Sequence, residues 1–283
     1  MIVATTIAEC RSHRAELGRL ALVPTMGALH AGHVSLMEAA RQHAPKVAVS
    51  IFVNPTQFGP REDFQKYPRP IELDLDMCKA AGVDLVFNPS PEEMYSPTVP
   101  ELLLDIPSLS SVLEGRVRPN HFKGVCQVVA KLFNILQPSV ACFGLKDYQQ
   151  LRILTAMVLA LDWPIEMIAC PTVRERDGLA MSSRNQYLSP AERQRALLIN
   201  RALFGAREDF FGGVRQANRL VTSIQNTLLE GGAPGGIAIT IDYVAAVDAT
   251  TLKPVENISG PTVLAVAARV GATRLIDNLI LTP

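Results

Sequence analysis

The sequence predicts an α/β fold, with a doubly wound, mainly parallel Rossmann-like sheet and a second, smaller α+β domain. In the first part of the chain, short apolar runs bounded by turn residues alternate with segments of helical periodicity, which is typical of a parallel sheet covered on both faces. The last part has two helical patterns followed by three runs that alternate like strands with one buried face. We therefore expect one domain at 1–175 and a smaller one at 176–283.

Five apolar runs are expected to form the strands of the larger sheet. They are LALVPT from Leu20, VAVSIFV from Val47, VDLVF from Val83, VACFG from Val140 and IEMIAC from Ile165. The helical patterns between them begin at His33, cover about 71–81 and 122–136, and follow Lys146. Strands that alternate with helices in this way build a doubly wound sheet, whose ligands bind beyond the carboxyl ends of the strands.

The C-terminal domain is expected to begin with a capped helix. Ser189 can act as the N-cap, with Pro190 at the first helical position and Glu192 at the third, close to a capping box. A second helix should reach Glu230 and end at the glycine-rich stretch 231–236. The runs at 237–247, 262–270 and 273–281 predict the strands of a small sheet.

Composition excludes several classes of protein. Lys plus Arg and Asp plus Glu both number 27, so the chain lacks the basic excess of a general nucleic-acid binder. The sequence shows neither a signal pattern nor an apolar stretch long enough to span a membrane, so we expect a cytoplasmic protein with no membrane partner. No C-x-x-C pair occurs among the five scattered cysteines, which argues against disulfides and a zinc cage: Cys10, Cys78, Cys126, Cys142 and Cys170.

The turn after the first predicted strand, in VPTMGALHAGH, carries two histidines. His30 and His33 lie where a helix begins, and the unpaired N–H groups there attract anions, phosphate above all. Gly27 and Gly32 allow a ligand to approach the backbone closely. A purely structural alternative is that one histidine caps the helix and the other packs on the sheet. The spacing and the strand–turn–helix context favour phosphate binding.

Polar residues follow three other predicted strands. Taken singly, NPTQF, GLKDYQQ and MSSR are typical of a turn, a solvated helix start and a loop, but all are expected at the carboxyl edge of one sheet. Basic and hydroxyl side chains there suit a triphosphate, Asp147 can accept from ribose hydroxyls, and Gln57 and Gln150 can orient a small polar substrate. The sequence has no G-x-x-x-x-G-K-[ST] or G-x-G-x-x-G motif, and zinc at the histidines lacks a third ligand.

The motifs also carry a family resemblance. His-x-Gly-His together with Met-Ser-Ser-Arg resembles the nucleotidyltransferase superfamily, which includes class I aminoacyl-tRNA synthetases. More specifically, eight segments resemble, in order, blocks of the pantoate–β-alanine ligase family, over nearly all of residues 20–188: PTMGALHAGH, SIFVNPTQF, DFQKYPR, EEMY, RPNHFKGV, KLFNILQP, KDYQQL and GLAMSSRN. The remaining C-terminal part matches the family only in length and pattern.

The resemblance implies that the first domain binds nucleotide and pantoate, and that the chain condenses pantoate with β-alanine using ATP and Mg²⁺. The products would be pantothenate, AMP and pyrophosphate, formed through a pantoyl-adenylate, and the protein would be a homodimer. By the same resemblance the catalytic residues are His30, His33, Lys146 and Arg184, and Asp74 matches an acidic position associated with magnesium. Further ATP contacts are implied for Pro24, Thr25, Met26, Gly144, Asp147, Val173, Met181, Ser182 and Ser183. Pantoate and β-alanine contacts are implied for Met26, Asn54, Gln57, Tyr67, Arg118 and Gln150.

Three positions depart from the family pattern, and three alternatives stay open. Leu145, Gln127 and Ser96 stand where Glu, Thr and Pro are common. The alternatives are a nucleotidyltransferase acting on a phosphorylated metabolite, an aminoacyl-tRNA synthetase, and a nucleotide-binding regulatory module without catalysis. No basic or anticodon-reading extension supports the second, and the intact basic residues argue against the third. The charged, proline-rich stretch 59–70 is expected to form a loop that covers the site.

Overall fold

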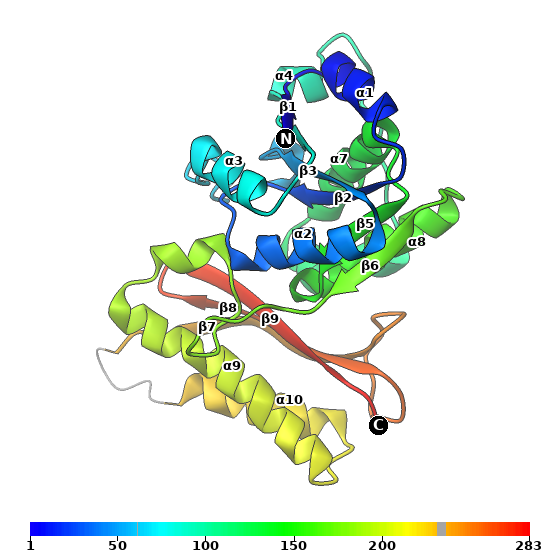
Figure 1. Ribbon diagram of the computed structural model, residues 1–283. Coiled ribbons are helices and arrows are strands. Elements are labelled where there is room, and N and C mark those ends of the chain that lie inside the picture. Colours follow the sequence, from blue (N-terminus) through cyan, green and yellow to red (C-terminus); the bar gives the residue numbers. More distant parts are fainter. Residues whose placement is uncertain (61, 231–235) are drawn as a thin grey trace. The chain divides into compact units, whose positions relative to one another are not determined.

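The computed structural model describes residues 1–60, 62–230 and 236–283, which form two compact units (Figure 1). The first unit comprises 1–110, 118–145 and 150–171, and the second comprises 111–117, 146–149 and 172–283. The division into domains at 1–175 and 176–283 stays a prediction. Residue 61 of the expected loop, and 231–235 of the expected glycine-rich helix end, lie outside the described residues.

The first unit contains a parallel sheet of six strands in the order β1-β4-β3-β2-β5-β6, which confirms the predicted fold class. The five predicted strands are all present, and one short edge strand, β1, was not predicted. The bounds are β1 Ile2–Ala4, β2 Leu20–Thr25, β3 Lys46–Ile51, β4 Leu85–Phe87, β5 Val140–Gly144 and β6 Glu166–Cys170.

The strand order places a topological switch point beside β2. From β2 the chain moves outward through β3 to β4, and it then returns to add β5 on the other side of β2. In open α/β sheets the crevice at such a point, beyond the carboxyl ends of the strands, is the usual ligand site. The histidine turn follows β2 directly, so the topology puts it at this position.

Helices bury both faces of the larger sheet. Ala21 and Val23 of β2 share a core with Leu36 and Met37 of α2, while Leu20 and Leu22, which point to the other face, are also fully buried. Burial of both faces explains why the sequence of β2 is a nearly continuous apolar run. The α-helices of this unit are α1 Ile7–Ala15, α2 Ala31–His43, α3 Ile71–Ala80, α4 Pro91–Met94, α5 Pro107–Ser110, α7 His121–Leu136 and most of α8 Tyr148–Ala160. The 3₁₀ turn η1 Pro55–Gln57 also lies in this unit, whereas η2 Leu145–Asp147 has its first residue here and its other two in the second unit.

The second unit packs two long helices on an antiparallel sheet of order β7-β8-β9 (Figure 1). The predicted capping box is present, since Ser189 Oγ accepts from Glu192 N and Ser189 N donates to the Glu192 carboxylate. None of the helices in the described part of the chain combines the length and apolar character needed to cross a bilayer. The elements are α6 Leu113–Val117, η3 Ser183–Tyr187, α9 Pro190–Phe211, α10 Ala217–Leu229, β7 Ile239–Asp248, β8 Thr262–Val270 and β9 Thr273–Leu281.

Candidate functional site

The side chains of the two histidines in the turn after β2 accept hydrogen bonds from backbone N–H groups at the start of helix α2. His30 is the N-cap, and its Nδ1 accepts from Gly32 N at 3.2 Å, while His33 Nδ1 accepts from His30 N at 3.3 Å. An Nδ1 that accepts a hydrogen bond leaves the proton of a neutral imidazole on Nε2. Capping therefore fixes both rings, whose centroids are 4.1 Å apart, in the tautomer that presents Nε2–H as a donor.

A buried carboxylate holds this turn in place. Asp74, in the first turn of α3, is only 1% exposed, and its two oxygens accept from Leu29 N at 2.7 Å and Ala28 N at 2.9 Å. Ala28 has φ +50°, a left-handed conformation that costs a non-glycine residue about 1–2 kcal/mol. At Gly27, with φ +79°, a Cβ would lie 2.8 Å from Asp74 Oδ2. The turn therefore needs glycine at 27 and the carboxylate at 74.

The surroundings of Asp74 do not form a metal cage. Burial raises the pKa of Asp74, and the two backbone N–H bonds oppose that rise. Among the described residues there is no group of three or more His, Cys, Asp or Glu side chains that could hold a metal ion. Both oxygens already serve the histidine turn, so the residues present fit a backbone clamp rather than a magnesium site built from protein groups alone.

Neutral amides lie at the carboxyl end of β3. Asn54, 1% exposed, caps η1, and its Nδ2 donates to Gln57 Oε1 at 3.1 Å. Gln57 Nε2 in turn donates to Met26 Sδ at 3.0 Å. The Gln57 side chain thus reaches back to the residue that follows β2. The structure brings three of the predicted substrate contacts, Met26, Asn54 and Gln57, into one group.

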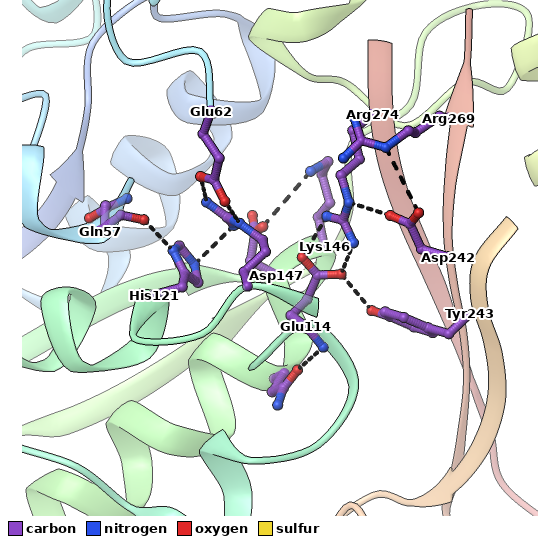
Figure 2. Close-up of polar contacts among 12 residues, drawn as sticks. Gln57, Glu62, Glu114, His121, Lys146, Asp147, Asp242, Tyr243, Arg269 and Arg274 are labelled. Carbon is purple, nitrogen blue, oxygen red and sulfur yellow. Dashed lines mark hydrogen bonds and ion pairs between the residues drawn. The ribbon is translucent and has the colours of Figure 1, made fainter. Parts of the chain in front are cut away.

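Gln57 is also fixed through its backbone. His121, at the start of α7, hydrogen-bonds the Gln57 carbonyl through Nδ1 at 2.8 Å and lies 3.1 Å from an Arg118 nitrogen through Nε2 (Figure 2). Gly124, one turn further along α7, leaves no room for a Cβ because the Thr56 carbonyl packs against it. No role for His121 was predicted from the sequence.

Arg118, predicted to contact substrate, forms a two-pronged ion pair with Glu62, at 2.8 and 2.6 Å. Burial of Glu62 favours its neutral form, but the bonds and charge of Arg118 hold the pKa of this carboxyl below its usual value. Tyr67 is 6% exposed and packs edge-on to Phe58. Glu62 and Tyr67 belong to the stretch 59–70, whose role as a covering loop stays a prediction.

In the second unit, Lys146 and Asp147 lie on η2, with Lys146 Nζ 3.9 Å from Asp147 Oδ1 (Figure 2). The backbone of this segment is anchored, since Asn278 Nδ2 on β9 donates to the Lys146 carbonyl at 2.8 Å. Gln149 accepts from Glu114 N at 3.0 Å and donates to the Val112 carbonyl at 2.8 Å. Segments 146–149 and 111–117 are therefore joined within this unit.

A buried ion-pair network secures these segments to the small sheet. Arg274 donates to both oxygens of Glu114 at 2.7 and 2.8 Å and to Asp242 at 2.6 Å, and Tyr243 Oη donates to Glu114 at 2.8 Å (Figure 2). Burial disfavours the charged form of Arg274, but the two carboxylates hold its pKa above the usual value. Removing one partner of such a buried pair leaves an uncompensated charge, which typically costs about 3–5 kcal/mol. None of these residues was predicted from the sequence.

The predicted adenine contacts lie side by side in the segment after β6. Met181 N donates to the Val173 carbonyl at 3.0 Å, so the chain folds back on itself between them. Ser182 then caps η3 by accepting from Arg184 N at 3.2 Å. Arg174 anchors the segment through two bonds to Asp277, at 2.6 and 3.0 Å.

The remaining predicted site residues lie at element ends. Pro24 and Thr25 end β2; Thr25 is 8% exposed, and its hydroxyl donates to the Ser50 carbonyl at 2.7 Å. Gly144 ends β5, and Gln150 is in the first turn of α8. Tyr95, whose hydroxyl donates to Asn54 Oδ1 at 2.8 Å, belongs to the amide group but was not predicted.

A family model and several similar proteins that cover nearly the whole chain indicate one family. The family model described as pantoate-beta-alanine ligase matches residues 2–280. The chain is 49% identical to pantothenate synthetase of Moorella thermoacetica, over 99% of both chains. Its structure is similar to the crystal structure of pantothenate synthetase from Thermus thermophilus, with a TM-score of 0.93, 43% identity and full coverage of both chains. It is also similar to pantoate-beta-alanine ligase from Francisella tularensis complexed with beta-gamma ATP and beta-alanine, with a TM-score of 0.80, 34% identity and coverage of 99% and 97%.

The clamp at Asp74 can be tested by Asp74→Asn. An amide offers the two backbone N–H groups only one acceptor oxygen, so we expect the free energy of unfolding to fall by about 2 kcal/mol and amide exchange at Ala28 and Leu29 to accelerate. Asp76→Asn changes an exposed carboxylate on the same helix and should alter neither. Denaturant titration and hydrogen exchange measure both effects. Recovery of the Asp74→Asn variant by added Mg²⁺ would instead indicate a metal role.

Proposed function

We propose a mechanism on one premise: the chain belongs to the pantoate–β-alanine ligase family and condenses pantoate with β-alanine to give pantothenate. In this proposal ATP drives the reaction, and pantoate is activated as a pantoyl-adenylate, with pyrophosphate and then AMP released. The Francisella relative, complexed with beta-gamma ATP and beta-alanine, supports the assignment of ATP and β-alanine as substrates here. Mg²⁺ is assigned as part of the ATP substrate, because Mg²⁺ is commonly bound through substrate phosphates and few protein groups.

The need for ATP follows from the chemistry of the acid. A carboxylate is a poor acylating agent, and water at neutral pH favours the free acid and amine over the amide. In the first step a carboxylate oxygen of pantoate bonds to the α-phosphorus, and the bond from that phosphorus to the bridging oxygen breaks. In the second step the β-alanine nitrogen bonds to the acyl carbon, the carbon–oxygen bond to AMP breaks, and the nitrogen loses a proton.

The observation that carries the proposal is the capped histidine pair. His30 and His33 present Nε2–H donors at the start of α2, where the helix dipole also favours negative charge. Preorganised donors of this kind stabilise the charge that grows on phosphate oxygens as pyrophosphate departs. Neither imidazole has to gain or lose a proton for this purpose, which suits a step that transfers no proton.

We assign the other residues by the same chemistry. Lys146, Ser182, Ser183 and Arg184 hold the phosphates of ATP, and His30, His33, Lys146 and Arg184 stabilise the leaving pyrophosphate. Gly144 and Asp147 hold the ribose, Val173 and Met181 flank adenine, and Pro24, Thr25 and Met26 complete the ATP contacts.

Pantoate binds to uncharged donors in this proposal. Gln57 and Gln150 hydrogen-bond its hydroxyl and carboxylate, and Pro24 and Met26 line its pocket. Neutral amides orient a carboxylate without the strong ion pair that would lower its nucleophilicity. Asn54, Tyr67 and Arg118 complete the sites for pantoate and β-alanine. Five free, buried cysteines in the described chain support the assignment to the cytoplasm, and a homodimer is proposed from the family resemblance.

Replacing either histidine of the pair should impair turnover with little effect on folding. We expect His30→Ala and His33→Ala each to lower kcat by roughly 10²-fold or more, the usual result of removing one preorganised donor. His43→Ala is the matched control, because His43 lies in the last turn of the same helix and should leave kcat unchanged. Steady-state kinetics give the answer, and near wild-type turnover in either variant would remove that histidine from the mechanism.

The route through an adenylate is tested by following oxygen. With pantoate labelled with oxygen-18 in its carboxylate, attack on the α-phosphorus leaves one labelled oxygen in AMP when the amide forms. Mass spectrometry of the products should therefore find labelled AMP and unlabelled pyrophosphate. ADP and labelled inorganic phosphate would show activation as an acyl phosphate and contradict the proposal.

A further inference from the structure

We propose that Tyr95 is a positioning residue for pantoate: through Asn54 it fixes which end of the Gln57 amide faces the substrate. This inference rests on the proposed binding of pantoate by Gln57 and extends it to a residue outside the contact set. It is carried by a chain of hydrogen bonds that runs from Tyr95 through Asn54 to Gln57 and Met26, all within the first unit.

The first link sets the orientation of Asn54. Its Oδ1 receives three donors: Tyr95 Oη at 2.8 Å, Thr56 Oγ1 at 3.0 Å and Thr56 N at 3.3 Å. A flipped amide would direct N–H groups at these donors. Burial raises the pKa of the Tyr95 phenol to about 12, so this hydroxyl keeps its proton at neutral pH. The oxygen of Asn54 therefore faces Tyr95 and Thr56.

The second link, from Asn54 to Gln57, determines the orientation of the Gln57 amide. With Oδ1 fixed, Asn54 Nδ2 points the other way and donates to Gln57 Oε1 at 3.1 Å and to the Gly124 carbonyl at 3.0 Å. Because only an acceptor can lie opposite Nδ2, the Gln57 oxygen faces Asn54. Asn54 is 1% exposed and both of its N–H groups are used, so its effect on the orientation of pantoate is transmitted through Gln57.

The result is that the Gln57 side chain offers a donor on the side that faces away from Asn54. The Gln57 nitrogen points away from Asn54 and donates to Met26 Sδ, and a thioether is a weak acceptor. A carboxylate or hydroxyl oxygen of pantoate is a stronger acceptor and can take over this N–H. A reversed amide would present an oxygen to the negatively charged substrate, so the fixed polarity selects for an acidic, hydroxylated ligand.

The test is a double-mutant cycle between Tyr95→Phe and Gln57→Ala, with kcat/KM for pantoate measured at saturating ATP. Loss of the hydroxyl should lower this value roughly threefold to tenfold in the wild-type background, with the KM for ATP unchanged. In the Gln57→Ala background the same change should have no further effect, because there is no amide left to orient.

A second variant, Thr56→Val, tests whether the effect of Tyr95→Phe arises from a folding defect. Thr56→Val removes another donor to Asn54 Oδ1 and should lower kcat/KM for pantoate in the same way, whereas Thr155→Val, which removes a hydroxyl bond inside α8, should not. Equal losses in both Gln57 backgrounds, equal effects on ATP and pantoate, or no effect of either variant would overturn the positioning role. Failure of the wild-type protein to consume pantoate would instead overturn the proposed function.

Discussion

The proposed binding site in the first unit depends on the pair of hydrogen bonds that Asp74 accepts from the backbone of Ala28 and Leu29. A parallel sheet ends its strands at loops, and loops have no ladder of backbone bonds to hold them. Here the two hydrogen bonds to one buried carboxylate hold the turn, and they keep Ala28 in a left-handed conformation that is unfavourable for an alanine. The cap at His30 begins two residues later, so the orientation of both imidazoles follows from this contact.

The same principle applies to the uncharged part of the site. Asn54 and Gln57 are almost fully buried, and a buried amide is stable only when its N–H and C=O groups are paired. Tyr95, Thr56 and Gly124 supply those partners for Asn54. The hydrogen bonds that offset the cost of burying these amides also prevent the amides from flipping. Stability and the orientation of donors toward a ligand are thus achieved by the same bonds.

Sequence patterns predicted the parts of this structure that depend on local order. The buried strands, the amphipathic helix α7 and the capping box at Ser189 follow from residues close together in the chain, and the histidine turn follows from its place between a strand and a helix. Strand β1 is only three residues long, which is too short to give an apolar pattern from which a strand can be predicted. The contact between Glu114 and Arg274 spans 160 residues and leaves no periodic signal, so neither it nor the assignment of 111–117 and 146–149 to the second unit could be predicted.

In the proposed mechanism, positioned donors activate pantoate before the amine takes part, and no covalent enzyme intermediate forms. The most direct measurement is isotope exchange between labelled pyrophosphate and ATP with β-alanine left out. If an adenylate forms reversibly on the protein, label enters ATP when pantoate is present and does not when it is absent. Exchange that needs β-alanine, or that proceeds without pantoate, would contradict the account.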